Sequence, residues 1–197
     1  MAGNKKLDAY HRKRDFAKTG EPRGRSRARK RDPHFVIQHH LATADHYDFR
    51  LEIAGVLVSW AVPKGPSLNP KEHRLAVRTE DHPMDYETFE GKIGEGQYGG
   101  GTVQVWDRGT FRNTSHDRKG EPVEAGDALE NGHLSFWLDG VKLRGGFSLI
   151  RTRQSDKSWL LIKKADETAD ARRKPTSTQA ESVLTGRSLD EIAAAEQ

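Results

Sequence analysis

His46-Tyr47-Asp48-Phe49-Arg50-Leu51-Glu52-Ile53 alternates polar and apolar side chains without interruption. Successive side chains of a strand face opposite sides of its sheet. The stretch therefore predicts a strand with an apolar face against a core and a second face that carries an imidazole, a guanidinium and two carboxylates. An ordinary half-buried strand shows the same alternation, but this choice of polar groups suits metal and phosphate chemistry better than simple solvation.

Short segments of similar character lie on both sides of this stretch. They are rich in Val, Ile, Phe and Trp and are separated by Gly, Pro, Asn and Asp, which is typical of strands and their turns. Strands this short at this spacing, with few helical stretches between them, predict an antiparallel barrel or sandwich. The expected strands are 35–40, 46–53, 56–63, 74–80, 102–106, 133–138, 141–143, 147–152 and 159–163.

Three glycine-containing stretches predict sharp changes of chain direction. Ala54-Gly55 and Asp139-Gly140 are typical of tight hairpin turns, and the Asp-Gly pair favours a type I′ turn. Tyr98-Gly99-Gly100-Gly101 lacks the strand–loop–helix setting of a nucleotide-binding loop. We therefore expect a tight turn there, or a close approach to another backbone.

The chain divides by composition into three segments. Residues 1–33 carry 12 Lys and Arg against 4 Asp and Glu and form a basic arm, expected to hold a short helix or ordered part and then a flexible linker. Such an arm favours contact with a polyanion, and a solvated tail explains the Arg-rich run 23–31 equally well. Residues 34–164 are expected to form the β domain, and 165–197 a polar, disordered tail with a weak helix over 188–196.

The sequence lacks both cysteine and long apolar segments, and these absences exclude several classes of protein. It contains no cysteine, which excludes disulfides, thiolate metal ligands and a cysteine nucleophile. No apolar run is long enough to span a bilayer, and the N-terminus has no apolar signal region. We therefore expect a soluble cytoplasmic protein with no membrane partner.

The polar face of residues 46–53 supplies candidate metal ligands. His46 and Asp48 lie on the same face, and His40, at the end of the preceding strand, can return to the same place. Two imidazoles and a carboxylate suit a catalytic metal, because three protein ligands leave positions open for water or substrate. The same set describes the facial triad of non-haem iron oxygenases, which stays open as an alternative.

Charged side chains around these ligands favour phosphate chemistry. Arg50 follows on the same strand face, where it can bind a phosphate with two N–H groups. Lys64 lies in a rigid Pro-Lys-Gly-Pro turn at a strand end, and His82 follows another strand end, where it can donate a proton. A metal among cations suits the hydrolysis of a phosphate ester. Further candidates are Arg74 and Glu80 and, on an arm expected to fold over the site, Arg14, Asp15 and Glu21.

Taken together, these motifs resemble the 3′-phosphoesterase domain of bacterial DNA ligase D. The likeness runs over residues 13–164. It includes Phe35-Val36-Ile37-Gln38, the stretch 46–52, Ser59-Trp60-Ala61-Val62-Pro63-Lys64-Gly65-Pro66-Ser67, Glu80-Asp81-His82-Pro83, Tyr86, Phe89-Glu90-Gly91, Tyr98-Gly99-Gly100-Gly101 and Val105-Trp106-Asp107-Arg108-Gly109.

The resemblance implies a compact antiparallel β-barrel and a Mn²⁺-dependent enzyme, although other divalent transition metals also fit. In the family, a terminal ribonucleoside is removed from a primer strand and the remaining 3′-phosphate is hydrolysed to a 3′-hydroxyl before nonhomologous end joining. The implied metal ligands are His40, His46 and Asp48. The implied catalytic residues are His82, Arg50, Arg14, Asp15, Glu21, Lys64 and Tyr86, and the implied substrate-binding residues are Gln38, Arg74, Glu80 and Ser59.

The implied partners are DNA or RNA–DNA 3′ ends, a separate DNA ligase or polymerase, and an end-binding protein. The resemblance therefore implies that the chain is a free-standing, nucleoid-associated member of the family that works with these partners. The chain departs from the family at Asp45, which stands in a loop where the family usually carries a basic residue, and this bears on substrate preference. A function of another class also stays open, namely a β-barrel module that binds single strands without cleaving them.

Overall fold

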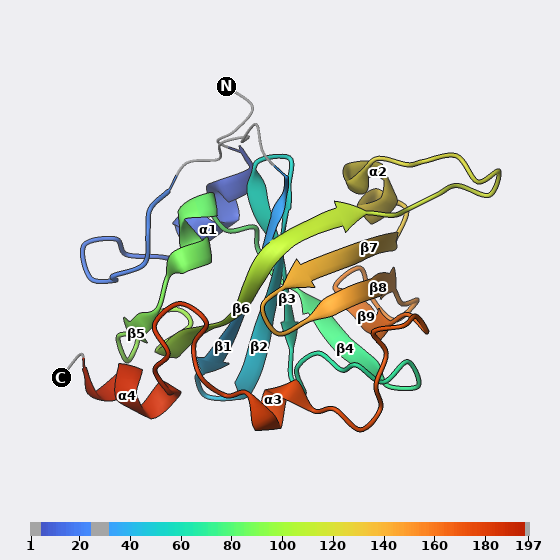
Figure 1. Cartoon of the computed structure of the whole chain (residues 1–197). Coiled ribbons are helices and arrows are strands. Elements are labelled where there is room, and N and C mark those ends of the chain that lie inside the picture. Colours follow the sequence, from blue (N-terminus) through green and yellow to red (C-terminus); the bar gives the residue numbers. More distant parts are fainter. Residues whose placement is uncertain (1–4, 25–31, 196–197) are drawn as a thin grey trace.

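The computed structural model describes residues 5–24 and 32–195. Within these residues, an antiparallel sheet of nine strands closes on itself (Figure 1). Eight of them form a barrel in the order β1-β2-β3-β4-β9-β8-β7-β6, which the β1–β6 pairing closes, while β5 lies beside β6 at the rim. The strands are β1 (His34–Leu41), β2 (Asp45–Ile53), β3 (Val56–Val62), β4 (His73–Arg78), β5 (Gly91–Ile93), β6 (Gly101–Asn113), β7 (His133–Gly140), β8 (Arg144–Arg151) and β9 (Ser158–Lys163). The barrel expected from the resemblance is confirmed.

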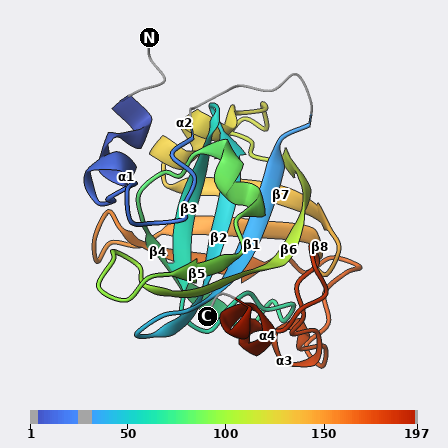
Figure 2. The ribbon, with the colours of Figure 1, turned by 90° about the vertical axis from the view of Figure 1, so that its left-hand side faces the viewer.

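Short helices lie on the outside of the barrel. The arm contributes η1 (Lys5–Leu7) and α1 (Asp8–Arg12), and η2 (Met84–Thr88) lies in front of β1 and β2 (Figure 2). The others are α2 (Ala125–Glu130), α3 (Pro175–Thr178) and α4 (Leu189–Ala194). None of the helices in the described part of the chain is both long and apolar enough to cross a membrane.

Both faces of β2 are covered. Tyr47, Phe49 and Leu51 belong to the main core cluster inside the barrel, together with Trp60 and Trp106. On the outer face, the arm and η2 form a second cluster with the barrel wall, composed of Tyr10, Val36, Leu57, Met84, Tyr86 and Val105. The predicted alternation of β2 is therefore present, but the polar side chains on its outer face lie largely beneath the arm and η2 instead of facing solvent.

Two details of the strand prediction are wrong around β7. Residues 141–143 form no strand: they belong to the loop between Asp139 and its partner Arg144, and Val141 is 70 % exposed. Gly140 lacks the positive φ that a type I′ turn needs at this position. By contrast, Ala54 (φ 51°) and Gly55 (φ 81°) do form a two-residue hairpin turn between the paired Ile53 and Val56.

Two further differences concern β5 and β6. Strand β5 was not expected from the sequence, and β6 continues well beyond the expected 102–106. The glycine-rich stretch before β6 makes the close approach that was expected. A Cβ on Gly101 would lie 2.3 Å from the carbonyl oxygen of Leu41, so only glycine lets β6 begin this close to β1.

The expectation of a disordered tail is wrong for residues 165–195. The Trp106 indole donates to Gln179 O (2.8 Å), and the Ile192 side chain is buried. Helix α4, within the expected 188–196, begins with a capping box formed by Ser188 and Glu191. Composition misled here because the segment is held mainly by polar contacts with the barrel, which hydropathy does not reveal. The basic run expected to contact a polyanion falls largely on 25–31, outside the described residues.

Candidate metal centre and its surroundings

His40, His46 and Asp48 come together on the outer face of β1 and β2. One potential ligand atom from each lies within 4.8 Å of the others, so the group could hold a metal ion. His40 Nδ1 lies 3.7 Å from Asp48 Oδ2, and His46 Nε2 lies 3.6 Å from Asp48 Oδ1. The β1–β2 register pairs His40 with His46 directly, which explains why residues from two strands converge.

The donor set fits a divalent transition metal. His46 Nδ1 lies 2.8 Å from the Ala44 carbonyl oxygen, and an N–H there leaves the lone pair on Nε2, the nitrogen nearer Asp48. The buried Nε2 of His40 has no hydrogen-bond partner among the described residues. Burial raises the pKa of Asp48, but Arg50 and the two histidines outweigh it and hold that pKa below its usual range. The carboxylate is therefore ionised and ready to bind a cation.

Arg50 organises the polar face beside these ligands. Its side chain is buried, and it donates from Nη2 to Asp48 Oδ2 (2.9 Å), from Nε to Gln38 Oε1 (2.8 Å) and from Nη1 to Ser59 Oγ (2.9 Å). A β-bulge shifts the β1–β6 register between Ile37 and Gln38, at the point where Gln38 turns its amide toward this cluster. Arg50, Gln38 and Ser59, all expected at the site, therefore meet in one network.

His82 completes this network from the loop after β4. Arg50 Nη1 approaches its Nδ1 at 2.8 Å, and because a guanidinium can only donate, this short contact favours Nδ1 as the acceptor and a ring proton on Nε2. The other tautomer would donate from Nδ1 to the Glu80 carbonyl oxygen at 2.9 Å and accept at Nε2 from Arg14 Nη2, 3.3 Å away. Burial, Arg50 and Arg14 lower the pKa of His82 well below its ordinary value. The ring is therefore neutral at pH 7, with one N–H and one lone pair.

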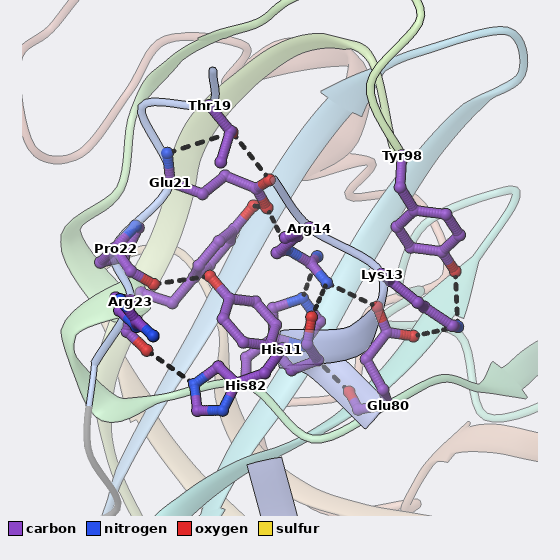
Figure 3. A network of polar contacts seen from close by, with 12 residues as sticks. His11, Lys13, Arg14, Thr19, Glu21, Pro22, Arg23, Glu80, His82 and Tyr98 are labelled. Carbon is purple, nitrogen blue, oxygen red and sulfur yellow. Dashed lines mark hydrogen bonds and ion pairs between the residues drawn. The ribbon is translucent and has the colours of Figure 1, made fainter. Parts of the chain in front are cut away.

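The N-terminal arm brings a second charged network over the site (Figure 3). Arg14 donates from Nε to Glu21 Oε1 (2.8 Å) and from Nη1 to Glu80 Oε1 (3.1 Å), and its Nη2 lies 3.3 Å from His82 Nε2. The hydroxyl of Tyr86, which lies in η2, donates to the same oxygen of Glu21 at 2.9 Å. Arg14, Glu21, Glu80 and Tyr86 therefore meet at His82, with Arg14 and Glu21 coming from the arm.

Three expected residues lie outside this cluster. Asp15 is on the arm but points to solvent, where it pairs with Lys18 (3.3 Å). Lys64 and Arg74 line a separate hollow at the end of the barrel. The structure therefore does not bring Asp15, Lys64 or Arg74 into contact with the Arg50–His82 network.

Sequence reasoning missed other residues of the arm network. Lys13 donates to Glu80 Oε2 (3.0 Å) and to the Tyr98 hydroxyl (2.9 Å), and the Tyr10 ring packs against Arg14. Spacing alone gives no signal for Tyr98, which belongs to the β5–β6 loop. Leu7 and Tyr10, both buried, belong to the part of the arm that was expected to hold a short helix or to be ordered.

The arrangement joins a cation site to anion-binding groups. A groove of about 600 Å³, bordered by His46 and by the 95–101 loop, gives access to the ligand group. Beside it lie a buried guanidinium and a neutral imidazole that can donate or accept a proton. Such a site can bind an oxyanion at a metal and transfer a proton next to it.

Comparison with known proteins agrees with this chemistry. The family model of the DNA ligase D 3′-phosphoesterase domain matches residues 38–151. The chain is 50 % identical over 171 residues to the multifunctional non-homologous end joining protein LigD of Pseudomonas aeruginosa, covering 84 % of this chain and 19 % of that protein. It is 46 % identical over 149 residues to the corresponding DNA repair protein of Mycobacterium tuberculosis, covering 75 % and 18 %. The chain thus spans about a fifth of the length of these relatives.

Proposed function

The chain belongs to the DNA ligase D 3′-phosphoesterase domain family, and on that basis we propose that it is a Mn²⁺-dependent 3′-phosphoesterase of DNA end repair. It removes a 3′-terminal ribonucleoside from a primer strand and hydrolyses a 3′-phosphate to a 3′-hydroxyl. The observation that carries the proposal is the His40–His46–Asp48 group directly beside the buried Arg50. A cation site and a fixed guanidinium next to each other suit a phosphate ester better than a neutral substrate.

His40, His46 and Asp48 would hold the metal. When bound, a divalent transition metal supplies Lewis-acid polarisation of a phosphoryl oxygen and a lowered pKa for bound water. Two imidazoles and a carboxylate suit Mn²⁺ as well as its first-row neighbours, and Mn²⁺ is the family's metal. Arg50 holds Asp48 in place through the 2.9 Å bond from Nη2 and keeps it ionised.

His82 is the proposed proton donor. Its lowered pKa keeps a single proton on the ring, and the shorter of the two guanidinium contacts, from Arg50 to Nδ1, favours that proton on Nε2. In phosphate hydrolysis the oxygen of a water molecule bonds to phosphorus and the bond between phosphorus and the 3′ oxygen breaks. The leaving oxygen takes up the proton of His82 Nε2, and the proton released by the water restores the ring. Arg14, Glu21 and Tyr86 position this ring: Arg14 approaches Nε2, and the Tyr86 ring packs edge-on at 4.7 Å.

The proposed substrates are DNA or RNA–DNA 3′ ends at a primer–template junction. The relatives are named as multifunctional non-homologous end joining proteins, and a healed 3′-hydroxyl is what a polymerase or ligase needs. We therefore place the chain beside those activities and an end-binding protein.

A gel assay tests this function. Two 5′-labelled primer–templates, one ending in a single ribonucleotide and one in a 3′-phosphate, are incubated with EDTA, Mg²⁺ or Mn²⁺. We expect Mn²⁺-dependent loss of the ribonucleoside and conversion to the 3′-hydroxyl. Tight binding without product from either duplex would refute the enzyme and favour a non-catalytic binding module.

A further inference from the structure

The C-terminal segment forms a charged hollow with the end of the barrel. The hollow is about 450 Å³ in volume and is lined by Lys64 from the turn after β3, by Arg74 on β4, and by Arg173 and Lys174 just before α3. Two carboxylates, Asp45 and Glu72, also line it. Four cations from three separate segments thus face the same space as two acids.

Both acids are already engaged. Asp45 lies 2.7 Å from His39 Nε2, and Glu72 accepts from Arg74 Nη2 at 2.5 Å. The ammonium groups of Lys64 and Lys174, in contrast, make no hydrogen bond or close ion pair with any residue that the structure describes. Arg74 Nε is buried and has no hydrogen-bond partner among the same residues. Lys174 acts on Glu72 through its charge, but the four cations of the hollow outnumber its two acids, and the hollow keeps hydrogen-bond donors that no described residue uses.

The hollow is built into the fold and not assembled from loose surface side chains. Gly65 has φ +67°, and a Cβ there would lie 2.8 Å from the Thr176 side chain and 2.9 Å from the Tyr47 ring. The Tyr47 hydroxyl donates to Thr176 O (3.4 Å), and Arg173 donates from Nη2 to Lys142 O (3.2 Å). Tight packing of the Lys64 turn against α3 therefore fixes the distance between the cations of the barrel and those of the C-terminal segment.

The position of the hollow relates it to the metal centre. Asp45 and Tyr47 of β2 border the hollow, whereas His46 and Asp48, which alternate with them, belong to the ligand group. Consecutive residues of a strand advance by about 3.3 Å. The two places therefore lie on opposite sides of the same strand end.

We propose that Lys64, Arg74, Arg173 and Lys174 form a site for an internucleotide phosphate of the strand whose 3′ end lies at the metal centre. The proposal deepens the function proposed above and rests on it. Arg173 and Lys174 lie beyond the residues 38–151 that the family model matches, so the family assignment gives them no role. Arg and Lys bind backbone phosphates of either sugar type, so the site holds DNA and RNA strands alike.

Binding measured without catalysis tests this site. A primer–template with a 3′-hydroxyl and a 5′-fluorophore is titrated in EDTA with the full chain, and anisotropy gives Kd over a range of NaCl concentrations. Arg173→Ala/Lys174→Ala should raise Kd several-fold and reduce the slope of log Kd against log salt by about one unit per lost phosphate contact. Lys174→Ala alone, which removes no protein hydrogen bond from that side chain, should give a smaller change in the same direction.

Arg118→Ala/Lys119→Ala is the matched control. It removes the same charge from an exposed dipeptide in the β6–α2 loop, which lies far from α3 in Figure 1. Equal loss of affinity in this control, or an unchanged salt slope in both Arg173/Lys174 variants, would overturn the site. This binding test does not depend on turnover. If the protein is inactive but the Arg173/Lys174 variants still lose affinity selectively, the phosphate site stands and the proposed function is refuted. If the protein is active but the variants bind like the wild type, the proposed function stands and the phosphate site is refuted.

Discussion

At the scale of single residues, the alternation of side chains along β1 and β2 predicted the ligand group and Arg50, and the family motifs supplied most of the residues around them. His40 rather than His39 faces Asp48, because His40 lies two residues after Gln38 and so on the same side of β1. This alternation does not reveal that Arg50 is held by Gln38 and Ser59, because those partners come from neighbouring strands whose register is set by the whole sheet. Nor does it show that Asp15 faces solvent, since the course of the arm depends on packing across the barrel.

His82 should make stability depend on pH. Its folded pKa lies below the unfolded value of 6.5, so below that pH the unfolded chain takes up a proton that the folded ring does not. Stability is then unaffected above pH 6.5 and falls as the pH decreases, by up to about 1.4 kcal/mol per pH unit. Urea unfolding in EDTA at pH 7.5, 6.5 and 5.5 should show this fall in the wild type and a weaker one in His82→Gln. The exposed His73→Gln should behave like the wild type, and parallel curves for all three proteins would contradict the assignment.

The hydrogen bond from Tyr86 to Glu21 should contribute to stability. It is buried and joins a hydroxyl to a carboxylate, so Tyr86→Phe should lower the free energy of unfolding by about 1.5 kcal/mol or more. Tyr98→Phe makes the same chemical change at a half-exposed position and should cost less than about 0.5 kcal/mol. Urea denaturation measures both, and an equal loss in the two variants would show that the arm is not held through Glu21.

At the scale of elements, long alternating strands were predictable and short or polar elements were not. β2 and β3 have clear patterns and a two-residue turn between them. β5 is too short for any periodicity, and the C-terminal segment is held by side chains whose partners are remote in sequence. Glu90 shows this most clearly, because it accepts from Ser182 Oγ, Thr185 Oγ1 and Arg187 Nη2.

Glu90 should therefore fasten the C-terminal segment to the barrel. Glu90→Ala removes these bonds, each of a kind worth about 1.5 kcal/mol or more. Hydrogen–deuterium exchange of residues 182–187 should become at least about tenfold faster, while exchange in β2 and β3 stays slow. Glu95→Ala changes an exposed residue of the nearby β5–β6 loop and should leave exchange unaltered. Unchanged exchange of residues 182–187 in the Glu90 variant would mean that other contacts hold the C-terminal segment on the barrel.

At the scale of the whole molecule, the barrel brings motifs that are distant in sequence together at one site. Closure by β1–β6 and the β4–β9 pairing join residues far apart in sequence, which local patterns cannot predict. The resemblance implied the barrel but not the way the arm covers its outer wall. On that wall His46 of the ligand group borders the groove that the glycine-rich loop lines, and the charged hollow beside α3 lies on the other side of the β2 strand end.

The central claim is that His40, His46 and Asp48 hold the metal on which 3′-end hydrolysis depends. Its most direct test compares the wild type with Asp48→Asn, which keeps the side-chain shape beside Arg50. Mn²⁺ binding is followed by electron paramagnetic resonance of the free ion, and 3′-phosphate release is assayed on the same preparations.

Asp48→Asn should weaken Mn²⁺ binding by at least about 100-fold and lose phosphate release in parallel, while the exposed Asp156→Asn retains both. A folded Asp48→Asn protein that binds Mn²⁺ with undiminished affinity, or releases phosphate at the wild-type rate, would contradict the account.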